Sequence, residues 1–84
     1  MNDVEPLPPY MQLKLKHAKE DVAAKVGGTY LEKSLDFELF TLKLMFEEVE
    51  REQSIELARE TLQYVQDVLY IADRYTPPKH ERGS

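Results

Sequence analysis

The stretch that decides the fold covers residues 35–75 and reads LDFELFTLKLMFEEVEREQSIELARETLQYVQDVLYIADRY. Its apolar residues recur every three or four positions, which is typical of amphipathic helices. No Gly or Pro interrupts it, but the apolar face shifts by about 100° between Val49 and Ile55. Ser54 is a suitable N-cap, and Glu56 stands in the first turn, where the helix dipole favours an anion. The stretch therefore predicts a helical hairpin with a break near Gln53. A single long helix is the alternative.

The second predicted helix, about residues 54–75, has two adjacent apolar stripes. One stripe contains Ile55, Ala58, Leu62, Val65, Leu69 and Ala72. The other contains Leu57, Thr61, Tyr64, Val68, Ile71 and Tyr75. Together they form a face that is broader than a two-helix seam and suited to a bundle.

The first predicted helix of the hairpin, about residues 30–52, is apolar on two sides. One stripe contains Leu35, Leu39, Leu42, Phe46 and Val49. Phe37, Phe40 and Leu44 point roughly the opposite way. Such a helix needs cover on both sides, so we predict a homodimer with these last three residues at its interface. A monomer in which an N-terminal helix covers the second face is the alternative.

A short amphipathic helix, about residues 10–26, is predicted before the hairpin. Its apolar stripe contains Met11, Leu15, Ala18, Val22 and Val26. Gly27-Gly28 predicts a left-handed C-cap, and Thr29 with Glu32 predicts a capping box for the next helix. Residues 10–75 then form one all-α domain. We expect a disordered leader at 1–9, with Pro8 or Pro9 setting the first helical turn, and a disordered tail at 76–84 after the stop at Pro77-Pro78.

Length, composition and charge limit the kinds of function that the protein can have. The chain has 84 residues, no Cys and a net charge of −5. A chain of this length can form one hydrophobic core of marginal stability, and oligomerisation is a common way to stabilise so short a chain. The acidic charge argues against nucleic acid as a partner. The absence of Cys, of a signal peptide and of an apolar run about 18 residues long leads us to expect a cytoplasmic protein that does not cross a membrane.

No group of residues predicts catalysis, a metal site or a cofactor. His17 lies near Glu20 and Asp21, but a metal needs three or four converging ligands, so we interpret His17 as a surface residue. We therefore predict that the protein is not an enzyme. Tyr70 lies on the polar side of the last helix beside Arg74, with Tyr75 at the helix end. Aromatic and guanidinium groups are enriched at binding hot spots, so these three residues are the predicted partner-binding site.

The hairpin also resembles a known family. Phe46-Glu47-Glu48-Val49, followed by Ser54-x-Glu56-x-Ala58-x-Glu60-x-Leu62 and then Val65, Leu69-x-Ile71-x-Asp73, resembles the NblA-like phycobilisome degradation proteins. This resemblance covers residues 35–75. It implies a helical hairpin that dimerises into a four-helix bundle. It also implies a non-enzymatic adaptor that binds a phycobiliprotein of the light-harvesting antenna and delivers it to a protease chaperone.

Two other functions stay open on the sequence. One is a small helical chaperone or assembly module, of secretion or phage type, whose apolar face binds one dedicated partner. The other is an inhibitor or decoy that docks an acidic bend on a basic surface. The acidic residues of that bend are Glu47, Glu48, Glu50 and Glu52. The N-terminal helix, in contrast, has a basic bias from Lys14, Lys16, Lys19 and Lys25. A solvated surface is the simpler interpretation of both charge clusters.

Overall fold

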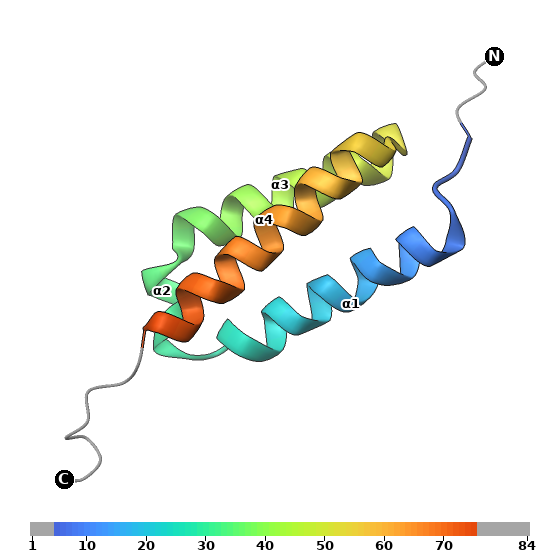
Figure 1. Ribbon diagram of the computed structural model, residues 1–84. Helices are drawn as coiled ribbons and strands as arrows, with labels where there is room; N and C mark the ends of the chain where they lie inside the picture. The colour runs from blue at the N-terminus through green and yellow to red at the C-terminus, as the bar shows by residue number, and fades with distance from the viewer. Residues whose placement is uncertain (1–4, 76–84) are drawn as a thin grey trace, which may run out of the picture.

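The computed structural model describes residues 5–75, and every regular element in that range is an α-helix. The helices are α1 (Pro9–Val26), α2 (Tyr30–Ser34), α3 (Asp36–Glu52) and α4 (Ile55–Arg74). In Figure 1, α3 and α4 form an antiparallel hairpin, and α1 runs alongside α4. The all-α prediction is confirmed. The predicted tail at 76–84 lies outside the described residues, as do residues 1–4 of the predicted leader.

The hairpin bend lies where the sequence predicts it. Gln53 ends α3 in a left-handed conformation, with φ 52° and ψ 37°, and its N–H donates to the Val49 carbonyl at 2.7 Å. Ser54 then caps α4, because its Oγ accepts a hydrogen bond from the Leu57 N–H at 3.2 Å. A side-chain acceptor at this position satisfies an N–H that the helix itself leaves unpaired. The break therefore follows from local capping chemistry.

The predicted unbroken helix over residues 30–52 is wrong at one position. Leu35 has φ −109° and ψ 25°, which separates α2 from α3. Leu31 and Leu35 are four residues apart and are both buried in the core. The helical hydrogen bonds continue through the break, because the Leu35 N–H donates to the Leu31 carbonyl and the Leu39 N–H donates to the Leu35 carbonyl, both at 2.8 Å. The break is therefore a local change in the backbone angles of Leu35 that leaves these hydrogen bonds intact.

The N-terminal helix packs as its pattern predicts, but more of the chain is ordered than expected. All five residues of the α1 apolar stripe are buried. Pro9 occupies the first turn, and Pro8 is the N-cap. Leu7 was assigned to the disordered leader, yet it is 4% exposed and packs in a cluster with Met11, Val49 and Ala58. The leader is therefore part of the fold from Leu7 onward.

The connection between α1 and α2 differs in detail from the prediction. Gly28, with φ +70°, adopts the left-handed conformation, whereas Gly27 is extended. Thr29 does cap α2, since its Oγ1 accepts from the Leu31 N–H at 3.0 Å. Its own N–H donates to the Val26 carbonyl at 3.2 Å rather than to the Glu32 side chain that a capping box requires. The turn thus uses the predicted residues with different hydrogen bonds.

The centre of the core is the face of α4 between its two predicted stripes. The buried residues of α4 are Ala58, Thr61, Val65, Val68 and Ala72. This face lies between the stripes because α4 packs against both α1 and α3. Ile55 and Tyr75, at the two ends of the stripes, are exposed. Phe46 and Leu62 pack against both core clusters and so connect them.

Candidate protein-binding surfaces

The outer stripe, which consists of Phe37, Phe40 and Leu44, is uncovered. These side chains are 72%, 57% and 48% exposed, although α1 is docked. α1 packs against α4 and lies on the opposite side of α3 from the outer stripe. The alternative monomer, in which the N-terminal helix covers the outer stripe, is therefore not the structure observed. Isolated exposed apolar residues are ordinary in proteins, but three of them on successive turns form a continuous patch. The outer stripe is therefore a candidate binding surface.

Two shallow hollows flank the outer stripe. The hollow on one side includes Asp36, Phe40 and Lys43. The hollow on the other side includes Phe37, Thr41 and Met45 of α3, and residues of α4 such as Tyr64 complete it. The outer stripe therefore has a flank of mixed charge beside Asp36 and Lys43, and an acidic flank toward Glu60 and Asp67 of α4.

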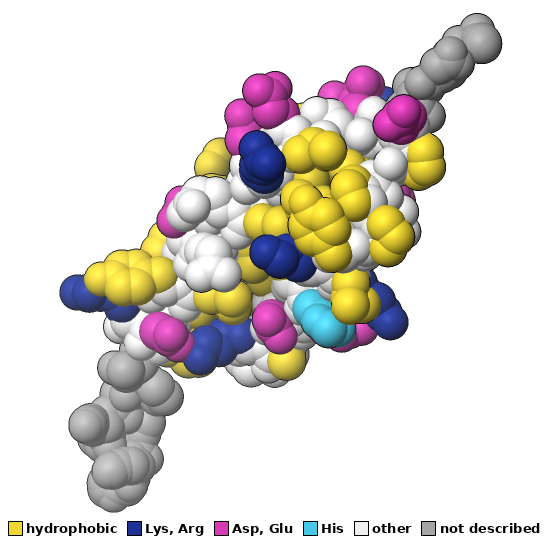
Figure 2. Space-filling view, turned by 45° about the vertical axis from the view of Figure 1, so that its right-hand side comes forward, with side chains coloured by type: hydrophobic (Ala, Val, Ile, Leu, Met, Phe, Trp, Pro, Cys, Tyr) yellow, Lys and Arg dark blue, Asp and Glu magenta, His cyan; other side chains and the backbone are white. Residues whose placement is uncertain are grey.

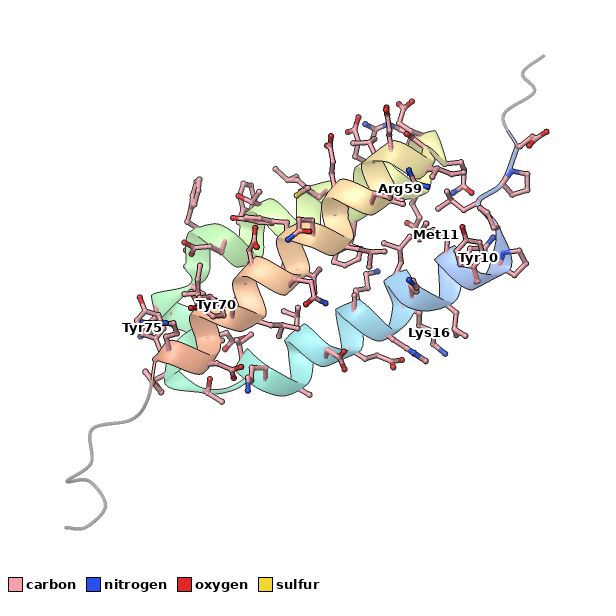
Figure 3. All side chains as sticks on the ribbon, in the orientation of Figure 1. Tyr10, Met11, Lys16, Arg59, Tyr70 and Tyr75 are labelled. Atoms are coloured by element: carbon pink, nitrogen blue, oxygen red, sulfur yellow. The ribbon has the colours of Figure 1, made fainter. Side chains whose placement is uncertain are left out.

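Tyr70 and Arg74 contact each other on the exposed side of α4. The Arg74 Nη1 donates to the Tyr70 hydroxyl at 2.8 Å, and the Arg74 guanidinium carbon lies 5.3 Å from the Tyr70 ring centroid. This geometry allows a cation–π interaction and holds both groups in one orientation. Tyr75 is also exposed, and its carbonyl accepts a hydrogen bond from the Tyr30 hydroxyl at 2.9 Å. The structure thus brings the three predicted residues to one end of the bundle (Figure 3) and adds Tyr30 to them.

The outer stripe and the Tyr70–Arg74 pair are different surfaces. The outer stripe belongs to α3, and the Tyr70–Arg74 pair belongs to the C-terminal end of α4. Asp73, beside Arg74 in the chain, forms an ion pair with Lys25 of α1, which ties the end of α1 to this end of α4. Sequence spacing could not have indicated this ion pair, because the two residues belong to different helices.

The acidic bend is partly neutralised by its own arginine. The Arg51 Nη2 donates to the Glu48 Oε1, and the Arg51 Nε lies 3.8 Å from the Glu52 Oε2. Glu47 and Glu50 are exposed, and both line the groove between α1 and α3 along with Lys19 and Lys43. Exposed ion pairs of this kind contribute little to stability. The bend therefore offers fewer free carboxylates than the sequence suggests.

A groove between α1 and α4 carries cationic side chains that the sequence analysis did not bring together. Tyr10, Met11, Lys14 and His17 line it from α1, and Arg59 and Leu62 line it from α4. Figure 2 shows apolar side chains gathered on one face beside basic ones and the histidine. In Figure 3, Tyr10, Met11 and Arg59 lie at the end of the bundle opposite Tyr70 and Tyr75. His17 thus lines a shallow groove that also contains Lys14, Asp21 and Arg59.

Within residues 5–75, no group of three or more His, Asp and Glu side chains could hold a metal ion. The described helices also include none that is both long and apolar enough to cross a bilayer. The fold is a small all-α bundle with exposed aromatic side chains. The chain matches no protein-family model, and comparisons with curated proteins and with solved structures find no match.

Proposed function

We propose that this protein is a non-enzymatic adaptor that binds another protein and acts as a homodimer in the cytoplasm. The outer stripe, which is exposed on a bundle whose other helices are already docked, supports the homodimer, and the exposed Tyr70–Arg74 pair supports the binding of another protein. Large exposed aromatic side chains in a continuous patch mark interaction sites more often than they mark plain surface. A surface of this kind requires no chemistry beyond contact.

The resemblance of the hairpin to the NblA-like proteins supplies the class of partner. We propose that the protein captures a phycobiliprotein and presents it to a protease chaperone. The hairpin of α3 and α4 occupies the stretch that carries the resemblance, and its bend is at Gln53 and Ser54. The identity of the partner rests on the resemblance.

We propose that the partner binds at the C-terminal end of α4. Tyr70 and Arg74 already hold each other in place, so binding them costs little side-chain entropy. Tyr75 and Tyr30 extend the same end with further exposed aromatic surface. Aromatic and arginine side chains are the groups that most often dominate binding energy at protein interfaces.

The test is a binding measurement with immobilised protein and purified phycobiliprotein. We expect the double variant Tyr70→Ala/Arg74→Ala to bind at least about 30-fold more weakly, a typical hot-spot loss of about 2 kcal/mol. The melting temperature should change little, because both side chains are exposed. Tyr10→Ala is the matched control, since Tyr10 is about as exposed as Tyr70 but lies at the other end of the bundle.

The possible results have distinct meanings. If the wild-type protein does not bind phycobiliprotein, the proposed partner is wrong. If it binds and the double variant binds equally well, the partner stands and the proposed surface is wrong. If Tyr10→Ala weakens binding as much as the double variant does, binding is not localised at the end of α4.

A further inference from the structure

An open groove runs between α1 and α3. Both helices pack against α4, but they make no comparable contact with each other. Two adjoining hollows form the groove, and both hollows include Lys19, Phe46 and Glu50. Within residues 5–75, neither hollow is lined by a residue of α4. The groove extends from Gln53 at the hairpin bend to Gly27 after the end of α1, so it follows almost the whole length of α1.

The floor of the groove is apolar and only partly covered. Phe46 belongs to both hollows and is half-buried, and the Lys19 Nζ lies 5.4 Å from the centroid of its ring. Leu39 is also half-buried, and Ala23 on the α1 side is exposed. The buried residues of the floor are Leu15, Val22, Val26, Leu42 and Val49. An amphipathic helix can cover a floor of this kind with its own apolar stripe.

The two rims of the groove differ in charge. Lys16 and Lys19 lie on the α1 rim, which has no acidic lining residue. Glu20 follows Lys19 in the chain but lines neither hollow. The facing rim has three acids and one base, and these residues are Glu32, Glu47, Glu50 and Lys43. Among residues 5–75, none of the charged lining residues forms an ion pair. The groove is therefore basic along one rim and mainly acidic along the other.

We propose that an amphipathic helix of another protein docks in this groove and becomes the fourth helix of a bundle. Its apolar stripe covers the half-buried Phe46, its acidic flank lies along the two lysines of α1, and its basic flank lies along the acidic rim. Four helices around one core are a common and stable arrangement. Because α1 has 18 residues, the groove accepts a helix about 27 Å long, which is about five turns.

The occupant is a helix because the walls of the groove are helices. The backbone groups of α1 and α3 are paired within each helix, so the groove offers almost no backbone partners to an extended peptide. A helix satisfies its own backbone hydrogen bonds and binds through its side chains alone, which is the helix-in-groove mode of recognition. The apolar floor provides the affinity. The rims determine which helix binds, because juxtaposed like charges at an interface are costly.

The groove shares no residue with the outer stripe or with the Tyr70–Arg74 pair, so this inference goes beyond the proposed function and does not depend on it. The test uses the purified full chain and three synthetic helical peptides, without any phycobiliprotein. All three peptides match α1 in length and have the same stripe of Leu and Ala at heptad spacing. The mixed-flank peptide has Glu on one flank and Lys on the other. The two control peptides have Glu on both flanks or Lys on both flanks. Fluorescence anisotropy of the labelled peptides should show that the mixed-flank peptide binds at least about tenfold more tightly than either control.

Two neighbouring alanines of α1 provide a matched pair of variants. Ala23 and Ala24 are both exposed, but Ala23 lines the groove and Ala24 does not. Ala23→Arg places a long charged side chain in the groove and should weaken binding of the mixed-flank peptide at least about tenfold. Ala24→Arg should bind this peptide as the wild type does. Arginine is a good helix former, so both variants should keep the circular dichroism of the wild type.

Charge reversal tests the role of the rims. Lys16→Glu/Lys19→Glu makes the α1 rim acidic as well, so this variant should bind the peptide with Lys on both flanks more tightly than the mixed-flank peptide. A wild type that binds no peptide, or that binds all three equally, would overturn the proposal. So would equal losses for Ala23→Arg and Ala24→Arg, or an unchanged preference after charge reversal. Sedimentation equilibrium without peptide tests for another occupant. A dimer that Ala23→Arg dissociates and Ala24→Arg does not would assign the groove to a second copy of this chain and would also overturn the proposal.

Discussion

The Leu7 N–H donates a hydrogen bond to the Gln53 Oε1 at 2.9 Å, although 46 positions separate the two residues in the chain. The other end of the same amide is also engaged, because the Gln53 Nε2 donates to the Glu50 carbonyl at 2.9 Å. One side chain at the hairpin bend therefore fixes both the end of α3 and the segment that leads into α1. This link closes the end of the bundle opposite the Tyr70–Arg74 pair.

Replacement of Gln53 should separate its backbone role from its side-chain role. Its left-handed backbone costs a non-glycine residue about 1–2 kcal/mol, and glycine avoids this cost. Gln53→Ala keeps the unfavourable backbone and loses both hydrogen bonds, so we expect a loss of about 1–2 kcal/mol in the free energy of unfolding. Gln53→Gly should lose less free energy of unfolding than Gln53→Ala, because glycine avoids the cost of the left-handed backbone. Urea denaturation measures both variants, and an alanine variant as stable as the wild type would contradict a structural role for the amide.

Leu7 should behave as a core residue. It is buried in one core cluster, so Leu7→Ala should cost about 2 kcal/mol or more in the free energy of unfolding. Leu13→Ala is the matched control, because Leu13 is 53% exposed on the neighbouring helix, and we expect a change within about 0.5 kcal/mol. The comparison is made by thermal or urea denaturation. Equal stabilities of the two variants would restore the disordered leader that the sequence predicted.

Thr61 is the buried polar residue of α4, and its hydroxyl should contribute little to stability. The side chain is 0% exposed, and its Oγ1 donates to the Leu57 carbonyl of the same helix at 2.8 Å. Thr61→Val removes the hydroxyl and keeps the branched shape, so no polar partner loses its only hydrogen bond. We expect a change within about 1 kcal/mol. Thr61→Ser keeps the hydroxyl but removes a buried methyl group, and it should cost about 1 kcal/mol. A valine variant much less stable than the serine variant would show that the hydroxyl matters.

The acidic bend offers a competing explanation for partner binding, and salt distinguishes it from the end of α4. We expect the reversal Glu47→Lys/Glu50→Lys to leave partner capture within about threefold of the wild type at both low and high salt. These two glutamates are suitable because they lie outside the ion pairs made by Arg51. Loss of capture in this variant, together with strong weakening by salt in the wild type, would favour the inhibitor or decoy function instead.

Local pattern determined most of the secondary structure. The five-residue stripe of α1 is the set that α1 buries, because a 3.6-residue period places those side chains on one face whatever they pack against. The bend at Gln53 and Ser54 was also predictable, since a phase shift of the apolar face and a suitable N-cap coincide there. The exposure of Tyr70 beside Arg74 follows from the same periodicity.

Tertiary packing decided what the local pattern left open. The burial of Leu7 and the choice of a core face between two apolar stripes of α4 both depend on which helices meet. The groove that brings Lys14 of α1 near Arg59 of α4 depends on this as well. Periodicity specifies a face on each helix, but it does not specify the neighbour. α1 packed against α4 and not over Phe37, Phe40 and Leu44, and for that reason the outer stripe remained exposed.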